Sequence, residues 1–109
     1  MLSERAGTGK CIVRTISLAM TLCCAPGCGS TLYSWEVGGA HQRLAEAREL
    51  GAEELAPYEY YSAVAHLEKA ESEAAEADYG DAIQLAELSE QYASRAIALS
   101  RAARRGDTP

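Results

Sequence analysis

The sequence has 109 residues, enough for one domain, and 48% of them are hydrophobic, although it contains no Phe and a single Trp. Many of the apolar residues are Ala, which forms helices well and buries little surface, so the composition favours closely packed helices over a deep core. The net charge of −6 argues against a nucleic-acid-binding function, because phosphate binding needs clustered cations.

The first 27 residues have the three parts of a secretory signal peptide. A polar start, MLSERAGTGKCIVR, carries Lys10 and Arg14, and the uncharged run TISLAMTLCCA follows over residues 15–25 before small residues end the segment. This run has 11 residues, whereas a membrane-spanning helix needs about 20. We therefore predict a signal peptide over residues 1–27 and not a permanent transmembrane helix.

Three of the four cysteines lie close together in LCCAPGCGS, residues 22–30. The run APGC resembles the lipobox of bacterial lipoproteins, since Ala25 and Gly27 fit its small positions, while Pro26 departs from it. The resemblance implies cleavage after Gly27 and attachment of lipid to Cys28, whose thiolate would form a stable thioether with the lipid donor.

Other uses of the cysteines remain open from the sequence. An ordinary signal peptidase would also suit the same bond and would give a plainly secreted periplasmic protein. A disulfide requires that the segment is retained in an oxidising compartment. A metal site requires cysteine pairs or histidines at recognisable spacing, and His41 and His66 lie far away. We predict a lipid anchor on Cys28, no metal and no cofactor. Lipoproteins that are kept at the inner membrane carry Asp at the position of Gly29, so the resemblance implies a location at the periplasmic face of the outer membrane.

The segment CGSTLYSWEVGG, residues 28–39, is short, aperiodic and contains Gly and Ser. This composition predicts a flexible tether. Its aromatic residues, Tyr33 and Trp35, would lie at the lipid interface or pack on the folded part, and the sequence does not choose between the two.

Helical periodicity begins at Ala40. A first helix is predicted over about residues 40–50, and Gly51 follows it as a stop. A second helix is predicted over about residues 57–77, because Pro57 suits a first helical turn. The residues expected on its apolar face are Tyr60, Val64, Leu67, Ala70, Ala74 and Ala77.

The run DYGD, residues 78–81, predicts a turn in which Gly80 takes an unusual backbone angle and Asp81 caps the next helix. A third helix is expected over about residues 82–104. Its apolar positions are Ile83, Leu85, Ala86, Leu88, Tyr92, Ala93, Ala96, Ile97 and Leu99. A face this wide needs two neighbours, so we predict a short antiparallel three-helix bundle over residues 40–109.

Two resemblances bear on the fold. The run EADYGDAIQLAE, residues 76–87, resembles the turn of a tetratricopeptide repeat, which implies a tetratricopeptide-like hairpin; His66 stands where such repeats carry a large aromatic residue. Residues 49–97, with GAEELAPYEY and DYGDAIQLAE, resemble a family of short helical domains of unknown function. Its members occur in bacterial envelope lipoproteins or beside domains like that of outer-membrane protein A. The resemblance implies a fold and a location, and says little about activity.

The predicted function is an interaction or scaffolding module and not an enzyme. His41 and His66 are the only neutral-pH proton carriers after Cys28, and no nucleophile or carboxylate pair accompanies them in the pattern. The candidate interaction surface is Tyr58, Tyr61 and Leu99, because tyrosine is enriched at interfaces. We expect a protein partner in the cell envelope. The alternatives are self-association, or an accessory subunit that completes a partner's helical bundle.

Overall fold

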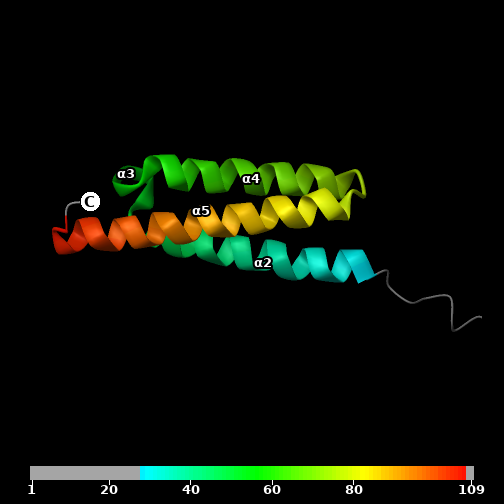
Figure 1. Cartoon of the computed structure of the whole chain (residues 1–109), viewed down its shortest axis with the longest axis horizontal. Helices are drawn as coiled ribbons and strands as arrows, with labels where there is room; N and C mark the ends of the chain where they lie inside the picture. The colour runs from blue at the N-terminus through cyan, green and yellow to red at the C-terminus, as the bar shows by residue number, and fades with distance from the viewer. Residues whose placement is uncertain (1–27, 108–109) are drawn as a thin grey trace, which may run out of the picture.

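The computed structural model describes residues 28–107, and every regular element in this range is a helix. The helices are α2 (Cys28–Glu49), α3 (Ala52–Leu55), α4 (Pro57–Ala75) and α5 (Tyr79–Arg105). The three long helices lie side by side, and α5 packs along both α2 and α4 (Figure 1). The all-α prediction is confirmed for the described residues, as is the expectation that the last helix contacts both others. The signal peptide predicted over residues 1–27 lies outside this range.

The flexible tether predicted over residues 28–39 is wrong, because these residues form the first half of α2. The Tyr33 ring packs against the Tyr79 ring of α5, with their centroids 5.9 Å apart. Gly39 lies so close to α5 that an added Cβ would be 3.3 Å from the Glu90 carboxylate. Glycine costs a helix about 1 kcal/mol relative to alanine, and these contacts with α5 offset that cost.

The connection from α2 to α4 follows the sequence signals and adds one element. Gly51 takes the left-handed conformation with φ 77°, as its predicted role as a helix stop requires. Pro57 is the first residue of α4, as predicted. Between them lies α3, a single turn that the periodicity did not predict, and its Ala52 is fully buried.

The turn between α4 and α5 differs from the prediction at two positions. Ala77, and not Gly80, takes the positive φ of 65°. Asp78, and not Asp81, is the N-cap, because its Oδ1 accepts a hydrogen bond of 3.3 Å from the Asp81 backbone N–H. The helix starts earlier than expected because the Tyr79 ring packs on α2, which draws residues 79–81 into its first turn.

Small side chains make up most of the core. Its main cluster consists of Ala47, Ala52, Ala56, Tyr60, Ala96 and Ile97. Tyr60 is the largest fully buried side chain, in agreement with the sequence pattern. Two serines of α5 are also fully buried: Ser89 Oγ donates a 2.7 Å hydrogen bond to the Ala63 carbonyl oxygen, whereas Ser100 Oγ has no partner within the described residues. Close approach of the helices therefore leaves polar atoms inside as well as alanine methyl groups.

Candidate docking surfaces

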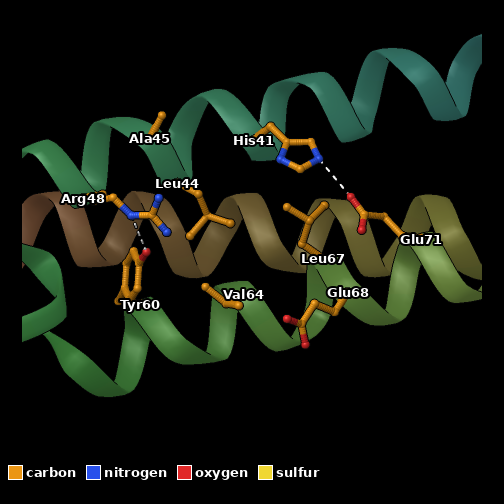
Figure 2. Close-up of a pocket in the computed structure, with 9 residues that line it drawn as sticks. All are labelled: His41, Leu44, Ala45, Arg48, Tyr60, Val64, Leu67, Glu68 and Glu71. Atoms are coloured by element: carbon orange, nitrogen blue, oxygen red, sulfur yellow. Dashed lines mark hydrogen bonds and ion pairs between the residues drawn. The ribbon is translucent and has the colours of Figure 1, made fainter.

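The first candidate surface is a groove between α2 and α4, which we name the α2–α4 groove. Its volume is about 330 Å³. Its lining residues are His41, Leu44, Ala45, Arg48, Tyr60, Val64, Leu67, Glu68 and Glu71. Figure 2 shows Leu44, Val64 and Leu67 pointing into the space between the two helices. The groove is thus apolar along its middle.

Polar contacts close the α2–α4 groove at both ends (Figure 2). At one end His41 Nε2 donates a 2.9 Å hydrogen bond to Glu71 Oε1, which links α2 to α4. At the other end Arg48 Nε lies 3.0 Å from the Tyr60 hydroxyl oxygen and 3.2 Å from Glu53 Oε1. The hydrogen bond to Tyr60 and the electrostatic interaction with it, and then the charge of Glu53, raise the pKa of the Arg48 guanidinium above its usual value. These two contacts fix the width of the groove.

The second candidate surface lies where the start of α4 meets the end of α5, and we name it the Tyr58–Leu99 groove. It has a volume of about 260 Å³. Its lining residues are Leu55, Ala56, Pro57, Tyr58, Glu59, Leu99, Ala102, Ala103 and Asp107. The Tyr58 side chain is 69% exposed and Leu99 is 36% exposed. This surface keeps apolar groups in contact with water, which is typical of interaction sites when such groups are contiguous.

The structure brings together two of the three residues predicted as an interaction surface. Tyr58 and Leu99 line the same groove. Tyr61 does not join them: its ring packs edge-on against Tyr60 at 5.2 Å, and it remains 57% exposed outside the groove. Tyr58 and Tyr61 are three residues apart, which places them about 60° apart around α4, and the groove reaches only Tyr58.

An aromatic cluster beside the Tyr58–Leu99 groove was not predicted. The Tyr92 ring stacks on the His66 ring at 5.3 Å and meets the Tyr58 ring edge-on at 6.3 Å. The Arg95 guanidinium lies over the Tyr92 ring, 5.5 Å from its centroid. The only advance signal was the spacing of Tyr58 and His66, eight residues apart and so on neighbouring sides of one helix. The cluster fixes the Tyr58 side of the groove to α5.

The remaining predicted site residues concern membrane attachment. Cys28 is the first residue of α2, while the cleavage residues Ala25, Pro26 and Gly27 lie outside the described range. None of the helices within residues 28–107 is long and apolar enough to cross a bilayer. In the same range no three or more His, Cys, Asp or Glu side chains gather in a group that would hold a metal ion.

Comparison with known proteins identifies one family. Residues 36–107 match the family described as a domain of unknown function, DUF4398. No curated protein and no solved structure matches the chain. The matched region runs from the middle of α2 to the end of α5 and includes both grooves. Since the match covers more than half of the sequence, the chain belongs to the DUF4398 family, a helical domain of unknown function.

Proposed function

We propose that this protein is a non-enzymatic, lipid-anchored module of the bacterial cell envelope that binds a protein partner through the Tyr58–Leu99 groove. The observation that carries the proposal is the convergence of exposed Tyr58 and Leu99 on one apolar groove. Aromatic side chains that are held in place but left exposed lose little conformational entropy when a partner covers them. The Tyr92 contact holds Tyr58 in this way.

The anchoring part of the proposal is supported by the sequence APGC and by the start of α2. A lipid on Cys28 would attach the bundle directly at a helix end, at the periplasmic face of the outer membrane. Several acyl chains make such an anchor durable, at about 0.8 kcal/mol for each buried CH₂. The plainly secreted alternative requires the same cleavage without lipid.

At the level of fold, the proposal includes a three-helix bundle with a tetratricopeptide-like hairpin. Its support is the antiparallel pair α4 and α5, which are joined by a short turn and packed along their length. Such a hairpin commonly presents one face to a partner. The accessory-subunit alternative, in which a partner's helix completes the bundle, is supported by the open α2–α4 groove.

Mass spectrometry of the mature full chain tests the anchor. We expect an N-terminal Cys28 that carries acyl chains, and Cys28→Ala should move the protein from the membrane fraction to the soluble periplasmic fraction. An unmodified N-terminus at Cys28, or a retained Met1, would contradict lipidation and would leave the docking proposal standing.

Photo-crosslinking tests the docking surface, with Tyr61 as the matched control. A photoreactive amino acid is placed at Tyr58 or at Tyr61 in the full chain, in cells. We expect a single defined adduct from Tyr58 and none from Tyr61, because only Tyr58 lines the groove. Leu99→Asp should abolish the Tyr58 adduct. Equal adducts from both positions, or an adduct that survives Leu99→Asp, would refute the proposed surface.

A further inference from the structure

The α2–α4 groove carries opposite charges at its two ends. The Arg48 side chain is 70% exposed and directs only its Nε toward Tyr60 and Glu53. At the other end, Glu68 is exposed and forms no ion pair within residues 28–107, and Glu71 accepts a hydrogen bond from the His41 imidazole and lies near the Tyr33 hydroxyl. One end of the groove is therefore available to an anion and the other to a cation.

These charges are placed symmetrically about the middle of the groove. Arg48 reaches α4 at Tyr60, and Glu68 lies eight residues further along, or about 12 Å at 1.5 Å per residue. Val64 is halfway between them and points into the groove (Figure 2). Ala45 of α2 also lines the groove and is exposed, so a second chain could approach closely there. A twofold rotation about this midpoint would exchange the positive end with the negative end.

The charge of the whole bundle selects the direction of such pairing. The half that contains residues 28–45 and 61–94 has nine acids and two bases, a net charge of −7. The half that contains residues 46–60 and 95–107 has six acids and five bases, a net charge of −1. Parallel association would place the two acidic halves together, whereas antiparallel association places each beside a nearly neutral half. Electrostatic repulsion is therefore smaller in the antiparallel arrangement.

We propose that two copies of this chain pair antiparallel across the α2–α4 groove. The twofold axis passes near Val64 and Ala45, so that Arg48 of each copy faces Glu68 and Glu71 of the other. Leu44, Val64 and the corresponding residues of the second copy exclude water between the charged contacts. The interface is isologous, as in most dimers, because the groove contains its own complement under a twofold rotation. A heterologous partner needs no such symmetry in the groove.

Sedimentation equilibrium of the full chain, in density-matched detergent, tests this pairing with charge reversals. We expect a monomer–dimer equilibrium that weakens with salt. Arg48→Glu and the double variant Glu68→Lys/Glu71→Lys should each weaken it roughly tenfold or more, since every reversal acts at two symmetric contacts. An equimolar mixture of the two variants should regain dimers, because each mixed pair restores opposite charges on both sides of the axis.

Controls separate the interface from the fold. Glu87→Lys reverses the charge of one exposed acid of α5 outside the groove and should leave dimerisation unchanged. Circular dichroism confirms helicity in each variant, since Arg48→Glu also removes the hydrogen bond to Tyr60. If Arg48→Glu does not fold, Arg48→Gln replaces it, and the double variant alone must still weaken the dimer.

The proposal is overturned if the wild-type chain stays monomeric at the highest concentration reached, or if the folded variants dimerise as tightly as the wild type. It is also overturned if the mixture of the two variants does not regain dimers. A wild-type monomer that instead binds a helix of another protein in this groove would favour the accessory-subunit alternative. The inference does not depend on the Tyr58–Leu99 groove: Leu99→Asp should abolish the Tyr58 adduct and leave the dimer intact, so the two proposals fail separately.

Discussion

The two buried serines of α5 form a matched pair of perturbations. Ser89 and Ser100 have the same residue type, the same helix and complete burial. They differ in one respect: Ser89 Oγ donates to the Ala63 carbonyl oxygen at 2.7 Å, and Ser100 Oγ has no partner among residues 28–107. Replacing each by alanine therefore isolates the value of one buried hydrogen bond.

The expected free energies of unfolding move in opposite directions. Alanine gains up to about 0.5 kcal/mol of helix propensity over serine at both positions, so this contribution cancels in the comparison. Ser89→Ala loses a hydrogen bond worth about 1 kcal/mol and should be destabilised by roughly 0.5 kcal/mol. Ser100→Ala removes a buried unsatisfied hydroxyl, which costs about 1–3 kcal/mol, and should be stabilised by at least about 1 kcal/mol.

Urea denaturation followed by circular dichroism measures both values. A separation of about 2 kcal/mol corresponds to roughly 10 °C between the two melting temperatures in a domain of this size. Unchanged m-values would show that neither variant alters the denatured state. If Ser100→Ala unfolds as easily as Ser89→Ala, Ser100 must have a partner of its own, and the reasoning from the packing of α5 is refuted.

Three further predictions concern the turns, the pH dependence and the exposed aromatic residue. Gly51→Ala should destabilise the protein by about 1 kcal/mol and Ala77→Gly should stabilise it by a similar amount, since both positions have positive φ. Urea titrations that show both variants changing the free energy of unfolding in the same direction would contradict this. The second prediction concerns pH: the hydrogen bond from Lys69 to the Glu73 carboxylate raises the pKa of Lys69, and burial raises the pKa of Tyr33. Both groups have pKa values of about 10 in the unfolded chain. Their contributions to the free energy of unfolding are therefore complete below about pH 10, and they are lost as the pH rises through the higher pKa values of the folded state. Chemical denaturation should show this decline, with a smaller one in Lys69→Gln. Trp35 is 80% exposed, so iodide should quench its fluorescence readily. Vesicles of outer-membrane lipid should shift its emission to the blue only if Trp35 enters the membrane–water interface.

Local signals in the sequence predicted the parts of the fold that depend on single residues. Gly51 and Pro57 mark an end and a start because their backbone chemistry permits little else. The tether prediction failed because the Gly and Ser content of residues 28–39 is typical of a flexible segment, whereas contacts of Gly39 with Glu90 and of Tyr33 with Tyr79 hold this segment against α5 as a helix. Propensity is a weak prior wherever tertiary packing is available.

The candidate sites were less predictable for a different reason. Tyr58 and Leu99 were predicted as interaction residues, but their meeting in one groove depends on how α4 lies on α5. The α2–α4 groove draws its lining from two helices, and no pattern within either helix reports it. Ser89 and Ser100 were not predicted as core residues, since a small hydroxyl gives the same signal on the surface and in a tight helix contact.

The start of α2 at Cys28 affects how the protein would be oriented on a membrane. Ala45, beside the proposed twofold axis, is 17 residues from Cys28, or about 26 Å along a rigid helix. If Cys28 carries lipid, a single copy is held at one end and can stand or tilt freely. In the antiparallel pair the two anchors would lie about 50 Å apart along the helix direction, at opposite ends of the dimer. Pairing would then lay the protein flat along the bilayer and double its acyl chains, so that self-association controls orientation as well as attachment.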